Sequence, residues 1–142
     1  MKVAIAADHG GFELKEALKK HLTGITLTDL GTHSTDSVDY PDYGADLARK
    51  VAAGEFERGI LICGSGIGIS IAANKIHGIR AALCHNAYTA EMARRHNDAN
   101  VIAMGGRVVD ENTAIEMTRI FLNTDFEGGR HARRVEKLNS IQ

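Results

Sequence analysis

The sequence has 142 residues, a length that fits one compact domain over residues 1–142. Hydrophobic residues make up 44% and charged residues 25% of the chain, which excludes the disordered, collagen-like and coiled-coil classes. The formal net charge is -1, from 17 Lys and Arg against 18 Asp and Glu, so no positive field is available to hold nucleic acid.

The first apolar run, residues 3–7, is too short for a signal-peptide core or for a membrane span. We therefore expect a cytoplasmic protein that binds no membrane. The two cysteines, Cys63 and Cys84, are too far apart for a Cys-x-x-Cys motif, and a reducing compartment disfavours a disulfide between them.

The first part of the chain predicts strands separated by amphipathic helices. Residues 2–7 form an apolar first strand, and a helix with apolar positions over residues 14–22 follows and ends at Gly24. A second strand over residues 25–30 leads into a polar loop, residues 31–43. A long loop after a strand is a candidate binding loop.

The same alternation continues to the last helix. Strands are predicted at residues 59–63, 79–84 and 101–104, and helices at residues 42–53, 64–78, 87–96, 111–122 and 130–141. Strands that are apolar on both faces indicate a parallel sheet covered on both sides. We therefore predict an α/β fold: a three-layer, Rossmann-like sandwich of a five-stranded parallel sheet, helices on both faces and a C-terminal helix.

In such a fold, ligands bind at the carboxyl ends of the strands, where helix N-termini present unpaired amides. This rule selects five segments, residues 8–11, 31–43, 63–68, 84–86 and 105–107. Candidate functional residues are therefore sought first in these segments.

The sharpest local feature is the run Cys63-Gly64-Ser65-Gly66-Ile67-Gly68. Its Gly-x-Gly-x-Gly spacing after the third strand does not match the Gly-x-Gly-x-x-Gly of dinucleotide-binding proteins, and no Gly-Lys-Ser/Thr follows as in a P-loop. The small residues can instead turn several backbone amides toward one oxyanion at the start of a helix. A purely structural tight turn is the alternative.

Cys63 strengthens the functional interpretation of this run. A thiol at a strand end, directly before a helix N-terminus, lies where the thiolate is favoured and where amides surround anything it attacks. The alternative is a small apolar side chain that fills the strand end. Cys84 ends the next strand without glycines after it, and we expect it to be structural.

Several basic residues are candidates for binding an anion. His9 follows the first strand directly, and Arg107 follows Gly105 and Gly106 at the end of the fifth strand. Arg130 and Arg134 lie one helical turn apart, so that both guanidiniums can bind one phosphate. A solvated basic helix is the alternative for this pair, and helix capping is the alternative for His96.

The chain resembles B-type ribose-5-phosphate isomerases, in a family that also contains galactose-6-phosphate isomerase subunits. The resemblance covers nearly the whole chain in order and rests on these motifs: Asp8-His9-Gly10-Gly11-Phe12, Asp39-Tyr40-Pro41, Cys63-Gly64-Ser65-Gly66-Ile67-Gly68, Ala72-Ala73-Asn74-Lys75, His96-Asn97-Asp98, Gly106-Arg107-Val108-Val109, Gly128-Gly129-Arg130-His131 and Arg134-Val135.

The resemblance implies an isomerase that interconverts ribose 5-phosphate and ribulose 5-phosphate through a cis-enediolate, without a metal or a cofactor. In this family, Cys63 would be the base for the carbon-bound proton, Ser65 would move the hydroxyl proton, and His96 would open the furanose ring with Asp8 nearby. The implied contacts to the enediolate, the sugar hydroxyls and the phosphate are Gly64, Gly66, Ile67, Gly68, Tyr40, Asn97, His9, Arg107, Arg130 and Arg134.

The resemblance also implies a homodimer with shared active sites, in which Arg107 comes from the second subunit, with a tetramer as the alternative. One branch of the family uses a Glu on the following helix as base, but Ile69 occupies that place here, so the cysteine mechanism is expected. Two other functions stay open: an isomerase of allose or galactose 6-phosphate, and a non-catalytic protein that binds a sugar phosphate. The roles of His85 and His131 stay open as well.

Overall fold

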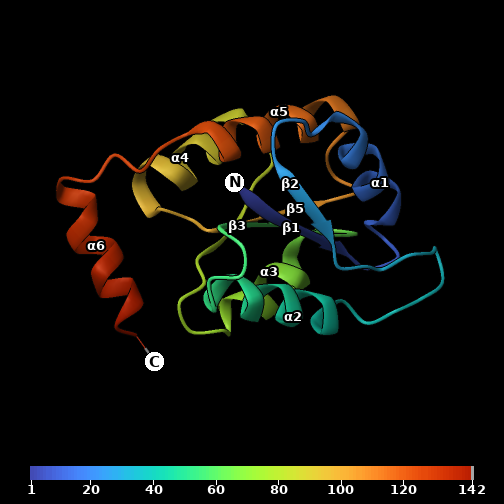
Figure 1. Cartoon of the computed structure of the whole chain (residues 1–142), viewed down its shortest axis with the longest axis horizontal. Coiled ribbons are helices and arrows are strands. Elements are labelled where there is room, and N and C mark those ends of the chain that lie inside the picture. Colours follow the sequence, from blue (N-terminus) through green and yellow to red (C-terminus); the bar gives the residue numbers. More distant parts are fainter. Residues whose placement is uncertain (142) are drawn as a thin grey trace.

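The computed structural model describes residues 1–141, and its centre is a five-stranded, all-parallel sheet (Figure 1). The strands are β1 (Lys2–Ala7), β2 (Thr26–Asp29), β3 (Arg58–Cys63), β4 (Ala81–Leu83) and β5 (Val101–Gly105). They lie in the order β2-β1-β3-β5-β4. Because all pairs are parallel, every strand ends at the same side of the sheet, here named the carboxyl edge; the opposite side is the amino edge.

Helices cover both faces of this sheet. They are α1 (Phe12–His21), α2 (Tyr40–Ala52), α3 (Ile67–Asn74), α4 (Ala87–Asn97), α5 (Glu111–Asn123) and α6 (Arg130–Asn139). Helices α1, α4 and α5 lie on one face, and α2 and α3 lie on the other (Figure 1). The three-layer α/β prediction is therefore confirmed.

The two cores explain why the central strands β1, β3 and β5 show no polar alternation. Along β1, Val3 and Ile5 pack into the core beneath α1, α4 and α5, whereas Ala4 and Ala6 pack into the core beneath α2 and α3. All four side chains are fully buried. A strand that is buried on both faces reads as a continuous apolar run.

Several predicted elements have different ends in the structure, among them the helix predicted at residues 64–78, which is observed as α3 over Ile67–Asn74. The strand predicted at residues 79–84 shrinks to β4, because the Ile79 N–H closes a turn to Ile76 and the Arg80 N–H bonds the Asn100 side chain. Helix α2 begins at Tyr40 rather than at residue 42. Pro41 lies in its first turn, where a missing N–H leaves no helical hydrogen bond unmade.

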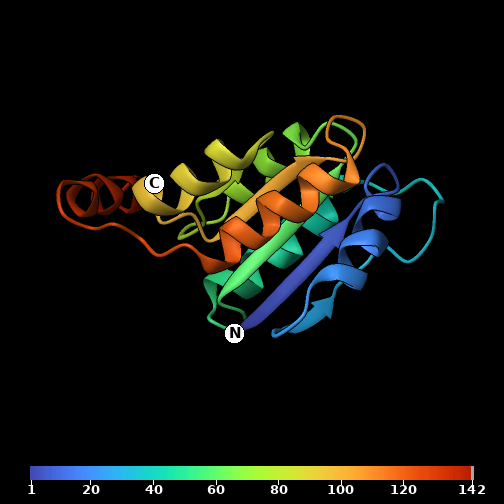
Figure 2. The same ribbon diagram turned by 90° about the horizontal axis from the view of Figure 1, so that it is seen from above.

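Helix α6 projects to one side of the three layers (Figures 1 and 2). Its main contact in the chain is with α4, and only His131 and Val135 of its residues are buried. Its remaining side chains, including Arg130 and Arg134, are exposed. Among residues 1–141, no helix combines the length and the apolar character that crossing a membrane requires.

Candidate active site

A first cluster of candidate residues forms at the carboxyl edge, where β1 and β3 lie side by side. Helix α1 leaves β1 toward one face and α3 leaves β3 toward the other, which opens a crevice between the two strand ends. Asp8 directly follows β1 and Cys63 ends β3. The loop after β5 contacts the segment that follows Cys63, because the Arg107 N–H donates to the Gly64 carbonyl at 3.0 Å.

The Cys63 sulfur accepts a hydrogen bond at the start of α3. The backbone N–H of Gly66 donates to its Sγ at 3.1 Å, and such a donor stabilises a thiolate. Gly66 is in the left-handed region with φ of 79°. A Cβ at this position would lie 2.6 Å from Leu83 Cδ1 and 2.7 Å from the Met104 carbonyl carbon, so the geometry requires glycine.

Asp8 and His9 hold the loop after β1 in place. Asp8 is buried, and its Oδ1 accepts the N–H groups of Gly10 at 2.9 Å and Gly11 at 3.2 Å. The His9 Nδ1 accepts the N–H of Val38 at 3.2 Å. A neutral imidazole whose Nδ1 accepts carries its proton on Nε2. His9 therefore keeps an N–H donor for a ligand.

Tyr40 and Arg107 border the Cys63 loop. A Cβ on Gly68 would lie 2.5 Å from the Tyr40 ring carbon Cζ, and a Cβ on Gly64 would lie 2.8 Å from Arg107 Nη1. Both glycines therefore make room for a side chain of the same chain. Ser65 Oγ accepts the Ile67 N–H at 3.2 Å. The carboxyl edge thus brings together Asp8, His9, Tyr40, residues 63–68 and Arg107.

A second cluster lies at the amino edge. Helix α4 connects two parallel strands, so it runs back across the sheet and ends at that edge with His96 and Asn97. The His96 ring stacks on His131 of α6, with ring centroids 4.2 Å apart and the planes inclined by 13°. Arg130 and Arg134 belong to the same helix α6. Figure 2 shows α6 at the end of the molecule from which the strands start.

The structure therefore divides the candidate residues into two groups. A six-residue strand spans about 20 Å, and this length separates His96 from Asp8 within one chain, which corrects the expectation that the two lie close together. Arg107 lies against its own chain's Gly64, so it shares an edge with Cys63 and does not belong to the distant group. The reason is the direction of α4: its start faces the carboxyl edge and its end does not.

The second cluster contains His96, Glu127 and His131, whose ligand atoms all lie within 4.8 Å of one another. A transition metal requires each imidazole nitrogen about 2.1 Å away and in line with the ring plane. The His96 and His131 rings are stacked with nearly parallel planes, so their in-plane nitrogen lone pairs do not converge on one metal ion. Among residues 1–141, His131 Nε2 is buried without a hydrogen-bond partner.

The two cysteines have different surroundings. Burial raises the pKa of the Cys84 thiol to about 11, although a hydrogen bond with Thr89 acts in the opposite direction. Cys84 therefore stays protonated at neutral pH. Within residues 1–141, no amide donates to its sulfur, which instead donates to the Ala82 carbonyl at 3.6 Å.

Sequence reasoning missed one residue of the second cluster and left another open. Arg80 Nε donates to the Asn97 carbonyl at 3.0 Å, but nothing in the sequence distinguishes this arginine at the start of a short strand. His131 lies in the motif Gly128-Gly129-Arg130-His131 at the start of α6. The sequence signal for its place in this cluster is its position four residues after Glu127. Its stacking on His96 is a tertiary contact that no spacing predicts.

Comparisons with known proteins agree along the whole chain. The family model described as Ribose/Galactose Isomerase matches residues 3–138. Ribose-5-phosphate isomerase B of Escherichia coli K12 is 48% identical over 143 residues, which cover 99% of this chain and 96% of that protein.

Two solved structures extend the agreement to three dimensions. Ribose-5-phosphate isomerase B of Clostridium thermocellum has a TM-score of 0.96 and 52% identity, covering 98% of this chain and 95% of that one. The Mycoplasma genitalium enzyme with bound ribulose-5-phosphate has a TM-score of 0.94 and 41% identity, covering 97% and 93%. The chain belongs to the ribose/galactose isomerase family.

Proposed function

We propose that this protein is an aldose–ketose isomerase that interconverts ribose 5-phosphate and ribulose 5-phosphate. The observation that carries the proposal is the Cys63 sulfur, which receives the Gly66 N–H at 3.1 Å beside a helix N-terminus. Relatives named ribose-5-phosphate isomerase B support the substrate, including one solved with bound ribulose-5-phosphate.

Cys63 acts as the base of the isomerisation. Its thiolate removes the proton from carbon 2 of the open-chain aldose, the released electron pair forms the double bond between carbons 1 and 2, and the carbonyl oxygen becomes an enediolate oxygen. The thiol then returns the proton to carbon 1, while Ser65 helps the hydroxyl proton move from oxygen 2 to oxygen 1. The amides of Gly64 and Gly68 hold the enediolate charge. The amides of Gly66 and Ile67, which donate to Cys63 Sγ and Ser65 Oγ in this structure, join them when substrate displaces those bonds.

The remaining residues position the substrate. His96 opens the furanose ring with the help of Asp8 of the partner chain, and Tyr40 and Asn97 bind sugar hydroxyls. The phosphate receives charge-assisted hydrogen bonds from His9, Arg107, Arg130 and Arg134. His9 is suited to this role, because its Nδ1 is occupied by the Val38 N–H and its Nε2–H is free to donate.

Each active site is built from two chains in this proposal. One sugar phosphate cannot span the roughly 20 Å between the two edges of the sheet, but a twofold dimer places the amino edge of one chain against the carboxyl edge of its partner. Two features support this arrangement. Ile67 and Val108 expose more than half of their surface beside the Cys63 loop, which is typical of an interface, and α6 projects from the body (Figure 1).

We also propose a cytoplasmic location, supported by two free thiols, Cys63 and Cys84, in keeping with a reducing compartment.

The test is a direct assay of aldose–ketose interconversion with ribose 5-phosphate, allose 6-phosphate and galactose 6-phosphate. We expect the highest kcat/KM with ribose 5-phosphate and the same rate after treatment with a chelator. A higher kcat/KM with either six-carbon substrate would replace the ribose assignment. Tight binding of ribose 5-phosphate without turnover would identify a sugar-phosphate sensor instead.

A further inference from the structure

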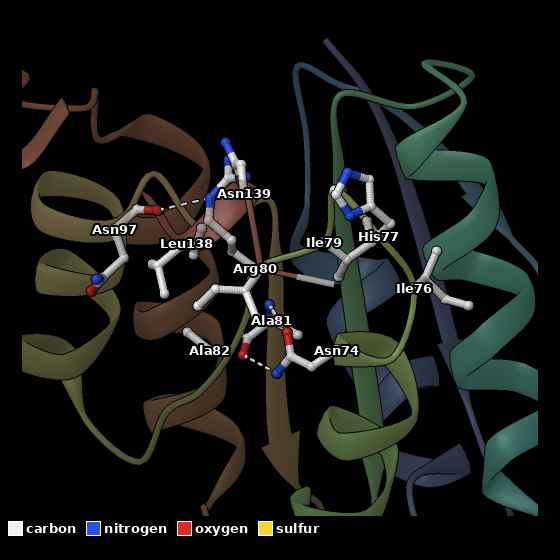
Figure 3. Close-up of a pocket in the computed structure, with 13 residues that line it drawn as sticks. Asn74, Ile76, His77, Ile79, Arg80, Ala81, Ala82, Asn97, Leu138 and Asn139 are labelled. Carbon is white, nitrogen blue, oxygen red and sulfur yellow. Dashed lines mark hydrogen bonds between the residues drawn. The ribbon is translucent and has the colours of Figure 1, made fainter. Parts of the chain in front are cut away.

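A cleft of about 520 Å³ separates α6 from the body of the molecule at the amino edge. Its walls include the start of β4, the end of α4 and the last turn of α6 (Figure 3). It contains none of the carboxyl-edge residues. The side chain of Arg80 lies within it, close to Asn97 and Asn139.

Arg80 connects two helices that the proposed active site needs. Its Nε donates to the Asn97 carbonyl at 3.0 Å and its Nη2 to the Asp98 carbonyl at 2.8 Å, both at the end of α4. Its Nη1 donates to Asn139 Oδ1 at 2.8 Å, at the end of α6. The base of the side chain is fixed as well, because the Arg80 N–H bonds the Asn100 side chain at 2.9 Å.

Helix α6 depends on few contacts within the chain. One is the stack of His131 on His96 near its start, another is the buried Val135 one turn later, and a third is the bond of Asn139 to Arg80 at its end. The first and the last of these contacts are eight positions apart along the helix, a length of about 12 Å. A helix held at one point can pivot about that point, whereas a second contact this far away fixes its direction.

We propose that Arg80 is a positioning residue that sets the placement of α6 relative to the end of α4. Through these two helices it fixes the spacing between His96, at the sugar ring, and the phosphate-binding Arg130 and Arg134. This inference rests on the proposed function for the roles of those three residues. Arg80 itself touches no substrate.

The geometry requires arginine rather than any cation. The three acceptors on Asn97, Asp98 and Asn139 are each met by a different nitrogen of the guanidinium fork. A lysine ammonium on a flexible stem cannot reach three acceptors in this fixed arrangement. Arg80→Lys therefore keeps the charge and loses the bridge.

The kinetic test uses Asn139→Ala, which removes only the α6 side of the bridge, and Arg80→Lys. Both variants should raise KM for ribose 5-phosphate and the inhibition constant of inorganic phosphate about fivefold or more, the effect of losing a hydrogen bond to a charged group, with kcat changed less than twofold. The matched control is Asn123→Ala: Asn123 also ends a helix, but within residues 1–141 its side chain bonds only Arg119 of its own helix. KM values of both variants within twofold of the control would overturn the proposal.

A second measurement needs no activity. Amide hydrogen exchange across residues 130–139 should be about tenfold faster in Asn139→Ala and Arg80→Lys than in Asn123→Ala, while the central strands keep their protection. Unchanged exchange over α6 would overturn the positioning role. If the unaltered protein did not isomerise ribose 5-phosphate, the proposed function would fail, and hydrogen exchange together with phosphate binding would still decide the role of Arg80.

Discussion

Cys63 and Cys84 differ in hydrogen bonding rather than in exposure. The two residues are 4% and 1% exposed, but in the part of the chain that the structure describes only the Cys63 sulfur accepts a backbone N–H, whereas burial raises the pKa of Cys84 to about 11. Because the thiolate is the reactive form, iodoacetamide at pH 7.5 should alkylate Cys63 first, as followed by peptide mass spectrometry. Ribose 5-phosphate should protect Cys63. Faster labelling of Cys84 would contradict the assignment.

Replacement of Cys63 tests its role as the base. General acid–base groups contribute about a hundred- to ten-thousandfold in rate, so Cys63→Ala should lose at least this much turnover. Exchange of the carbon-2 hydrogen with deuterated solvent should stop as well. Substrate should still bind, because the phosphate contacts lie on other residues, and Cys84→Ala should retain activity. Near-normal turnover and exchange in Cys63→Ala would make Cys63 a core residue.

Asp29 links β2 to α1 and makes stability depend on pH. Burial raises the pKa of Asp29, but hydrogen bonds from Lys15, Lys19 and the Gly31 N–H outweigh burial and bring it to about 2, from 3.8. The Lys15 ammonium is fully buried and lies 2.6 Å from this carboxylate. The folded state therefore binds the Asp29 proton less readily than the unfolded state does.

The sign of the effect follows from this lowered pKa. The stabilisation, about 2 kcal/mol, is fully present above about pH 4 and is lost as the pH falls through about 2. Urea unfolding between pH 7 and pH 2 should show the loss. Asp29→Asn should destabilise the protein by about 2 kcal/mol at pH 7, because the buried Lys15 ammonium keeps only the Glu16 carboxylate at 2.9 Å of its two carboxylate partners, and by less at pH 2. An equal cost at both pH values would refute the assignment.

At the scale of the elements, the loop between β3 and α3 depends on Gly66. Gly66→Ala would place a Cβ 2.6 Å from Leu83 Cδ1 at a φ of 79°, where an L-residue is strained. The loop must then shift, and the N–H that donates to Cys63 moves with it. We expect a loss of at least about tenfold in kcat, with unfolding destabilised by about 1 to 3 kcal/mol. Unchanged kcat would show that this N–H is dispensable.

The sequence predicts the elements better than the site. Continuous apolar runs predict β1, β3 and β5, because these strands are buried on both faces, whereas β2 alternates with Thr and is partly exposed. The start of β4 depends on the Asn100 side chain and escapes any local rule. The carboxyl-edge residues follow strands directly and were therefore predictable. The position of His96 was also predictable in principle, because a helix between parallel strands runs back to the amino edge. The contacts of Arg80 and His131 join segments far apart in sequence and were not.

At the scale of the whole molecule, the proposed function implies that the chain holds two incomplete halves of one site. The half with Cys63 can hold the enediolate, and the half with His96, Arg130 and Arg134 can open the ring and bind the phosphate. The two halves lie at opposite edges of a rigid sheet, so no hinge within the chain brings them together. In the proposed function, a second copy of the chain therefore supplies the missing half.

Mixed dimers test this division. Cys63→Ala and His96→Ala proteins, each nearly inactive alone, are unfolded and refolded together, and native mass spectrometry verifies that mixed dimers form. One of the two sites in each mixed dimer then combines an intact Cys63 with the partner's intact His96. Random pairing makes half of the dimers mixed, so activity should return to about a quarter of the unaltered level.

The matched control is the pair Cys63→Ala and Arg107→Ala. Both residues lie at the carboxyl edge of one chain, so every site in their mixed dimer lacks one of them and activity should stay near that of Arg107→Ala alone. Recovery in this control, with none in the first mixture, would instead assign Arg107 to the partner's site. Equal recovery of activity in both mixtures would contradict the proposed division between the two edges of the sheet. The absence of recovery in both mixtures would contradict it as well.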